Sequence, residues 1–159
     1  MHRIRKFSQW TLLLGWIPTF LLVGYWITQP AAVNAAEART PIMISRIYTG
    51  TDGQTHVEEI QVPLNRQNDG STTELSLLET AQSIQFRRTS PDYFIDWHNA
   101  PRRQYVITLR GESEVEFGDG TKVRLYPGHI LLAEDTTGQG HISRALGDED
   151  RLSIFVPLD

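Results

Sequence analysis

Hydrophobic and polar positions alternate in short runs along most of the chain after about residue 39, a pattern typical of β-strands. The runs are rich in Val, Ile, Leu, Phe and Tyr, and Gly, Pro, Asp and Asn separate them. Ten strands are predicted, at residues 42–48, 56–62, 84–88, 93–97, 104–110, 114–117, 122–126, 130–133, 141–145 and 152–156. Ten short strands in so few residues predict a closed barrel or jelly roll, because closure removes open sheet edges.

Two segments refine this prediction. Residues 114–117 and 122–126 flank a Gly-Asp-Gly sequence, which is typical of a β-hairpin turn. Residues 74–81 are ambiguous, because LSLLETA fits a helical turn as well as an extended segment. The prediction for this part of the chain therefore stays open between the two.

The first 35 residues follow a different pattern, in which a basic start precedes an apolar run. Three basic residues lie within the first six positions, Trp10–Ile27 is almost wholly apolar, and no acidic residue occurs before Glu37. Small residues around Ala35 fit a signal peptidase site. The run is also close to the ~20 residues that span a bilayer. Residues 1–35 are therefore predicted to be a signal peptide or a membrane anchor, with residues 36–159 exported to the periplasm or secreted.

Composition and charge exclude several classes of site. The chain contains no cysteine, so disulfides, thiolate metal sites and thiol nucleophiles are all excluded. It carries 15 Lys and Arg against 19 Asp and Glu. All the Lys and Arg of the N-terminal segment lie in its basic start, so the remainder is more acidic still. Nucleic-acid binding needs a basic patch, so no nucleic-acid partner is expected. Membrane contact is expected only through the N-terminal segment.

Two stretches in the second half resemble the two sequence motifs of the cupin family. The first, residues 97–112, matches the family's His-x-His, Glu and Gly pattern in part. The second, residues 125–141, contains Pro127-Gly128 at a turn into a strand and ends on a His. The resemblance is to small bacterial single-domain cupins. It implies that residues 36–159 form an all-β, cupin-type β-barrel or jelly roll.

The resemblance also implies a candidate metal site, since cupins commonly hold one divalent metal with three His and one Glu. Counted back from Gly111, the first three ligand positions fall on His98, Ala100 and Gln104. The last falls on His141, two residues later than the usual spacing after Pro-Gly. His98, Gln104 and His141 are therefore the expected metal ligands. They would bind Zn, Fe, Ni or Mn more weakly than the full set, because Ala cannot ligate and an amide oxygen is neutral.

Strand alternation predicts which side chains face the interior of the barrel. Gln104, Val106 and Thr108 should point inward, and the residues between them should pack on the outer side. A small barrel has room for its own side chains or for one small ligand. Gln104 is thus a candidate to contact a ligand, or to cross-link the barrel wall through hydrogen bonds.

Three further polar residues are candidates for ligand binding. Glu134 and Asp135 begin the polar segment 134–140, which is either a surface loop or a lid, and either carboxylate would replace the missing one. Arg102 would bind a carboxylate or phosphate at the mouth of the barrel, or form an ion pair with a local acid such as Asp96.

The predicted function is that of an exported cupin-domain protein which binds a small polar molecule in its barrel, with or without a weakly held divalent metal. The alternative is a metal-dependent cupin enzyme of the dioxygenase or isomerase type, for which open metal positions would be useful. A barrel that only forms a homodimer through one sheet is a third interpretation. The sequence contains no Gly-x-Ser-x-Gly elbow and no phosphate-binding Gly-rich loop, and the catalytic residues remain unknown.

Overall fold

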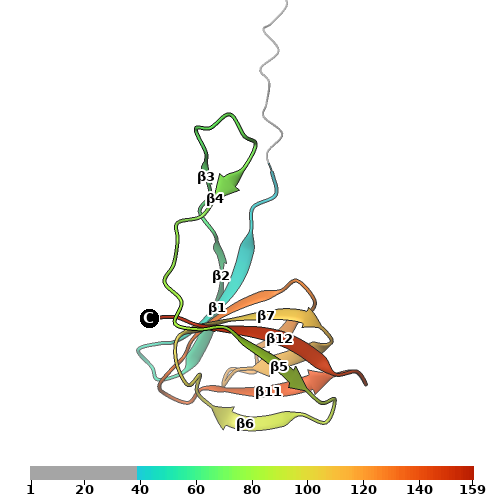
Figure 1. Ribbon diagram of the computed structural model, residues 1–159. Helices are drawn as coiled ribbons and strands as arrows, with labels where there is room; N and C mark the ends of the chain where they lie inside the picture. The colour runs from blue at the N-terminus through green and yellow to red at the C-terminus, as the bar shows by residue number, and fades with distance from the viewer. Residues whose placement is uncertain (1–38) are drawn as a thin grey trace, which may run out of the picture. The chain divides into compact units, whose positions relative to one another are not determined.

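The computed structural model describes residues 39–159, and every regular element in this range is a β-strand (Figure 1). The prediction of an all-β fold is therefore confirmed. Within these residues no helix is long and apolar enough to cross a membrane. The expected signal peptide or membrane anchor lies outside the described residues.

The ten predicted strands are all present, with ends displaced by no more than two residues. The strands are β1 (Met43–Thr49), β2 (Thr55–Gln61), β3 (Asn65–Arg66), β4 (Glu74–Leu75), β5 (Gln85–Thr89), β6 (Phe94–His98), β7 (Gln104–Arg110), β8 (Glu112–Glu116), β9 (Lys122–Leu125), β10 (Ile130–Glu134), β11 (His141–Leu146) and β12 (Arg151–Pro157). The short strands β3 and β4 are additions. The ambiguous segment 74–81 contains β4 and an isolated bridge at Ala81, is otherwise irregular, and forms no helix.

Two main sheets face each other as the layers of a jelly roll (Figure 1). The larger sheet has the strand order β2-β1-β10-β7-β12-β5, and the smaller has the order β6-β11-β8-β9. Neighbouring strands are antiparallel except for β1 and β10, which run parallel. Strands β3 and β4 form a separate hairpin between β2 and β5.

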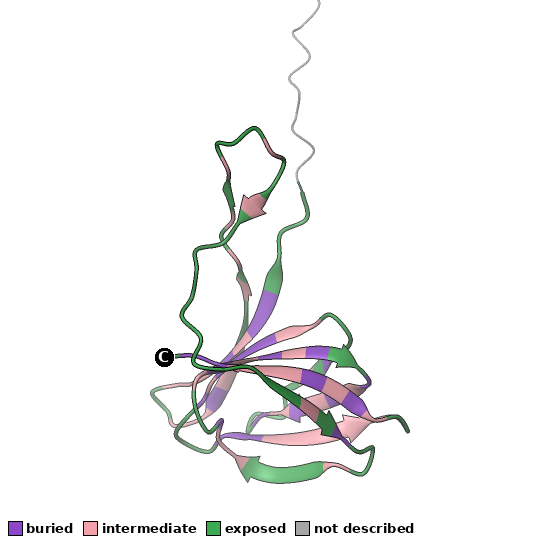
Figure 2. Cartoon of the chain, in the orientation of Figure 1, coloured by how far each residue is buried: buried purple, intermediate pink, exposed green. Residues whose placement is uncertain are grey.

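Alternation along β7 places polar and apolar side chains inside the barrel as predicted. Gln104, Val106 and Thr108 are buried, whereas Leu109 is exposed on the outer side (Figure 2). The inward side chains of both sheets form one apolar cluster. Its buried members are Ile47, Ala100, Val106, Val115, Phe117, Leu125, Leu131 and Ala133.

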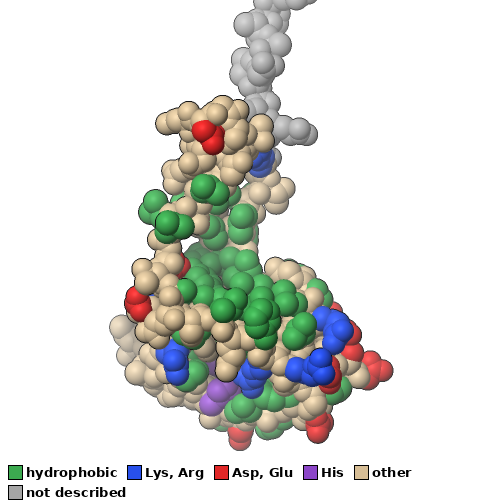
Figure 3. All heavy atoms as spheres, in the orientation of Figure 1, with side chains coloured by type: hydrophobic (Ala, Val, Ile, Leu, Met, Phe, Trp, Pro, Cys, Tyr) green, Lys and Arg blue, Asp and Glu red, His purple; other side chains and the backbone are tan. Residues whose placement is uncertain are grey.

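The outer face of the larger sheet is also apolar, which is unusual because an antiparallel sheet commonly presents one polar face to water. A second cluster of partly and fully buried side chains covers it. The members of this cluster are Ile44, Leu132, Leu158, Ile60, Val62, Tyr105, Ile130 and Val156. Phe86 on β5 is 69% exposed, and Figure 3 shows hydrophobic side chains gathered on one face. Exposed apolar surface of this kind is typical of a protein interface.

The expected homodimer stays a prediction, and this apolar face is the surface that would form it. We expect Phe86→Glu to shift the protein toward monomer in analytical ultracentrifugation, because a carboxylate buried in a dimer interface would lack a partner. Phe94→Glu is the matched control, since Phe94 is 59% exposed but lies on β6 of the smaller sheet. A wild-type monomer, or equal effects of the two changes, would contradict the prediction.

Candidate functional site

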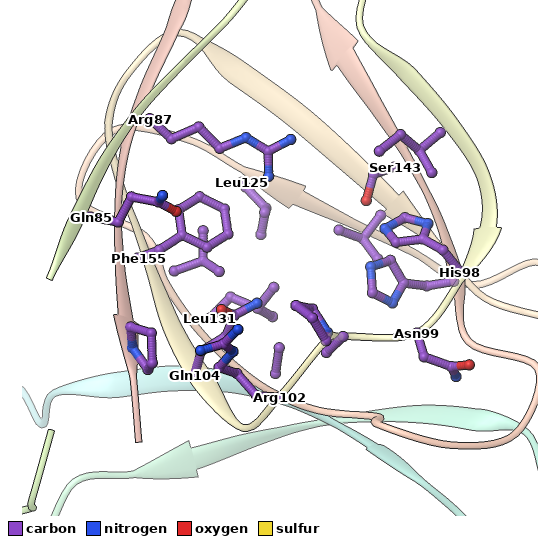
Figure 4. Close-up of a pocket in the computed structure, with 18 of the residues that line it drawn as sticks. Gln85, Arg87, His98, Asn99, Arg102, Gln104, Leu125, Leu131, Ser143 and Phe155 are labelled. Atoms are coloured by element: carbon purple, nitrogen blue, oxygen red, sulfur yellow. The ribbon is translucent and has the colours of Figure 1, made fainter. Parts of the chain in front are cut away.

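A cavity of about 480 Å³ lies between the two sheets (Figure 4). Apolar side chains of both sheets, among them Val106, Val115, Leu125, Leu131 and Phe155, form much of its wall. The polar side chains of the lining are Ser83, Gln85, Arg87, Tyr93, His98, Asn99, Arg102, Gln104, His141, Ser143 and Arg151. The cavity is therefore large enough for a small molecule and presents both apolar and polar groups to it.

Both histidines of the expected metal set lie side by side on one wall of this cavity. His98 ends β6 and His141 begins β11, and the two residues are opposite each other in the antiparallel pair. Their ring centroids are 4.4 Å apart, with planes inclined at 57°. A residue with a side chain would not fit before His141, because the Cβ of any residue at position 140 would collide with the His98 carbonyl group. Gly140, at φ +74°, therefore permits this close approach.

Each imidazole is oriented by a hydrogen bond from its Nδ1 atom. His141 Nδ1 donates to Asp135 Oδ2 at 2.6 Å, and His98 Nδ1 donates to the Asp96 backbone carbonyl at 2.8 Å. Asp135 is fully buried, and Thr55 Oγ1 also donates to its Oδ2 at 3.2 Å. A neutral imidazole whose Nδ1 carries the proton keeps an Nε2 lone pair that can accept a hydrogen bond or bind a metal.

The two candidate carboxylates have partners other than a ligand. Glu134 accepts from Arg46 Nε at 2.5 Å and from Arg103 Nε at 2.6 Å. Glu134 and Asp135 are both absent from the cavity lining, since Asp135 lies behind His141 as its hydrogen-bond partner. The structure therefore does not bring either carboxylate to the position of the missing metal ligand.

The other two candidates do line the cavity. Gln104 is buried, and Figure 4 places it with Arg102 on the side of the cavity away from His98. Within residues 39–159 Arg102 makes no ion pair, and Asp96 accepts the Trp97 N–H instead of pairing with it. Arg102 therefore stays available to a ligand.

The segment 135–140 is held to the barrel by several hydrogen bonds. Thr137 carbonyl oxygen accepts from Asn99 Nδ2 at 2.6 Å and from Thr49 Oγ1 at 2.9 Å. The Gln139 N–H donates to the Gly53 carbonyl at 2.9 Å. The segment is the loop between β10 and β11, and these hydrogen bonds fix it against neighbouring parts of the barrel.

Two arginines of the site were not identified from the sequence. Arg87 on β5 and Arg151 on β12 both line the cavity. The pair Arg87-Arg88 did carry a signal, because adjacent residues of a strand point to opposite faces, so one of the two must face inward. No comparable signal marks Arg151, which starts its strand after a polar turn.

The residues present do not fit the family's four-ligand metal site. In the described part of the chain, no group of three or more His, Cys, Asp or Glu side chains is placed to hold a metal ion. His98 and His141 offer two imidazoles, and the amide of Gln104 lies across the cavity. A metal bound by this set would lack the usual carboxylate and third imidazole.

The pH dependence of stability should report the burial of His98. Burial lowers the pKa of His98 below its usual value, an effect only partly opposed by its bond to the Asp96 carbonyl and reinforced by the nearby His141. Below about pH 6.5 the His98 side chain therefore binds a proton more readily in the unfolded chain than in the folded protein. The free energy of unfolding decreases as the pH falls.

We expect His98→Gln to flatten this dependence between about pH 7 and pH 5. The measurement is urea unfolding of both proteins at each pH, with a chelator present. Superimposable pH curves for wild type and variant would contradict the prediction.

Comparison with known proteins gives only remote likenesses. No protein-family profile matches the sequence, and no curated protein matches it. Among solved structures, the Cnp3 cupin domain of Schizosaccharomyces pombe is 14% identical, with 78% of this chain and 88% of that chain covered and a TM-score of 0.38. A conserved Streptococcus pyogenes protein of unknown function is 15% identical, with coverage of 76% and 79% and a TM-score of 0.38.

A Neisseria meningitidis protein is 16% identical, with 50% of this chain and 78% of that chain covered and a TM-score of 0.39. TM-scores this low carry no argument. The chain's own features are two facing sheets in the order described and two motif histidines paired across β6 and β11. The described unit is a jelly roll of two facing β-sheets.

Proposed function

We propose that the barrel binds a small polar molecule in the cavity between its sheets. The observation that carries this proposal is the mixed lining of the cavity of about 480 Å³, in which apolar walls surround several convergent polar groups. Such a combination is typical of small-molecule sites, because apolar contact provides affinity and a few polar groups fix orientation. If the interior were only a hydrophobic core, side chains would fill it and would leave no cavity of this size.

Each part of the lining has a distinct role in this proposal. Phe155 and Leu131 would contact the apolar part of the ligand, while Gln104 would donate or accept a hydrogen bond through its amide. The Nε2 atoms of His98 and His141 would accept hydrogen bonds from ligand hydroxyl or amide groups, because their Nδ1 atoms already donate to protein oxygens.

A metal-dependent dioxygenase or isomerase is the second candidate, and the adjacent imidazoles favour it. Zn, Fe, Ni or Mn would be held through His98 and His141 alone, because the amide of Gln104 lies on the other side of the cavity. A bound metal would supply Lewis acidity toward a substrate oxygen. The set of donors is short of a carboxylate, which is why we rank binding without chemistry first.

The site of action is part of the proposal. The basic start and apolar run of residues 1–35 support export, so the barrel would meet its ligand outside the cytoplasm. A ligand taken up there would be a small molecule of the periplasm or of the medium.

Filling the cavity should abolish small-molecule binding. We expect Ser143→Trp to eliminate the hits of a fragment screen by ligand-observed NMR, because the indole would occupy the cavity that Ser143 lines. Ser76→Trp is the control, since Ser76 is exposed and does not line the cavity. Fragments that bind the Ser143→Trp variant as well as wild type would contradict the proposal.

Metal content should separate the two candidate functions. We expect dialysed wild-type protein to hold less than one equivalent of metal by mass spectrometry of the elements, because two imidazoles without a carboxylate bind a divalent ion weakly. His141→Ala should remove what remains, and His56→Ala, which changes an imidazole outside the cavity, should not. One full equivalent of metal that resists dialysis would favour the enzyme.

A further inference from the structure

The charged side chains that line the cavity are all basic. Of the residues in 39–159 that line it, Arg87, Arg102 and Arg151 are cationic, and none is Asp or Glu. This is the reverse of the chain as a whole, which has more Asp and Glu than Lys and Arg. The cavity therefore has an electrostatic character that the overall charge does not predict. This positive charge bears on which kind of ligand the cavity would bind under the proposed function.

Arg151 is the most unusual of these residues, because it is a buried cation that has no counter-ion among residues 39–159. Its exposed fraction is 5%. Its Nη1 atom donates to Ser113 Oγ, but its Nε atom is buried with no hydrogen-bond partner in the described part of the protein. No carboxylate of residues 39–159 forms an ion pair with it. Burial lowers the pKa of Arg151 from its usual value, which reflects the cost of keeping this charge away from water.

Arg87 also lines the cavity, and no carboxylate of residues 39–159 forms an ion pair with it. Its guanidinium carbon lies 5.2 Å from the Tyr93 ring centroid and 5.2 Å from that of Phe155, and its Nη2 donates to Tyr93 Oη at 3.1 Å. Arg151 lies 5.9 Å from the same Tyr93 ring. Figure 4 shows the Arg87 side chain extending from β5 toward Leu125. The guanidinium groups of Arg87 and Arg151 thus both lie near the Tyr93 ring at the cavity wall.

Cation–π contacts offset only part of the cost of such an arrangement. A buried charge normally has a partner of opposite charge, because an unpaired one is expensive to remove from water. Elsewhere in the described unit, Arg46, Arg103, Arg124 and Arg144 each bind at least one carboxylate. None of the three cavity arginines, Arg87, Arg102 and Arg151, has such a partner among residues 39–159, and Arg151 is the one that is buried.

We propose that the ligand of the cavity is a small organic anion whose carboxylate or phosphate group binds Arg87 and Arg151. Guanidinium groups bind both kinds of oxyanion through paired N–H donors. The apolar part of the ligand would lie against Phe155 and Leu125, which line the same cavity. This inference rests on the proposed binding function and adds the chemical class of its ligand.

Stability of the ligand-free protein distinguishes this role from a purely structural one. We expect Arg151→Met to raise the melting temperature in a buffer without carboxylate or phosphate, because Met keeps much of the volume and removes an unpaired buried charge. A structural Arg151, held by Ser113 and Tyr93 alone, would instead make the variant less stable. The variant Arg87→Met provides a second measurement at a position that is less buried.

Binding is tested with probes of matched shape, namely benzoate, phenyl phosphate, the neutral benzamide and inorganic phosphate. We expect benzoate or phenyl phosphate to raise the melting temperature of wild type in a saturable way, and benzamide not to. Arg151→Met and Arg87→Met should each weaken the binding of the better anion roughly ten- to hundredfold by calorimetry. Arg88→Met is the control, since Arg88 follows Arg87 on β5, is not part of the lining and is exposed.

The outcomes separate this inference from the proposed function. Preference for benzoate over phenyl phosphate would assign a carboxylate, the reverse preference a phosphate, and binding of inorganic phosphate alone would overturn the organic anion. Equal binding of benzamide and benzoate, unchanged in Arg151→Met, would overturn the anionic class while leaving small-molecule binding intact. If no anion stabilises wild type at millimolar concentration the inference fails, and the fragment screen with Ser143→Trp decides the binding function separately.

Discussion

The hydrogen bonding of β11 to two neighbours holds the candidate site together. On one side β11 pairs with β6, which sets His141 against His98, and on the other it pairs with β8. Without β11, strand β6 would have no partner in its sheet and the wall that carries both imidazoles would be lost. Asp135 strengthens the start of this strand, because its buried carboxylate accepts the His141 Nδ1–H. The position of the imidazoles is therefore a result of sheet pairing before it is a result of side-chain chemistry.

The strands and the inward-facing residues were predictable because both depend on a period of two. Gln104, Val106 and Thr108 are buried as the alternation requires, and His98 and His141, named from the motif resemblance, lie side by side. The partners Arg46, Thr55 and Arg103 of Glu134 and Asp135 were not predictable, since they come from β1, β2 and the residue before β7, all far away in the sequence. Strand alternation also could not show that the cavity arginines lack carboxylate partners in the described part of the chain, because that depends on every neighbour in space.

The two sheets have different outer surfaces. On the smaller sheet, Arg144 and Lys122 form ion pairs with Glu114 and Glu116 across neighbouring strands, a pattern suited to contact with water. The outer face of the larger sheet carries the second apolar cluster instead. The two outer faces of the barrel therefore differ. That of the smaller sheet carries ion pairs exposed to water, and that of the larger sheet is apolar, so covering it would cost less desolvation free energy. Its interior adds a third environment, which concentrates positive charge in a chain with an excess of acidic residues.

The tight approach of Gly140 to the His98 carbonyl has a consequence for comparing this chain with distant relatives. Because a side chain at this position would collide with β6, the dipeptide Gly140-His141 is a better anchor for an alignment than the distance from Pro127-Gly128.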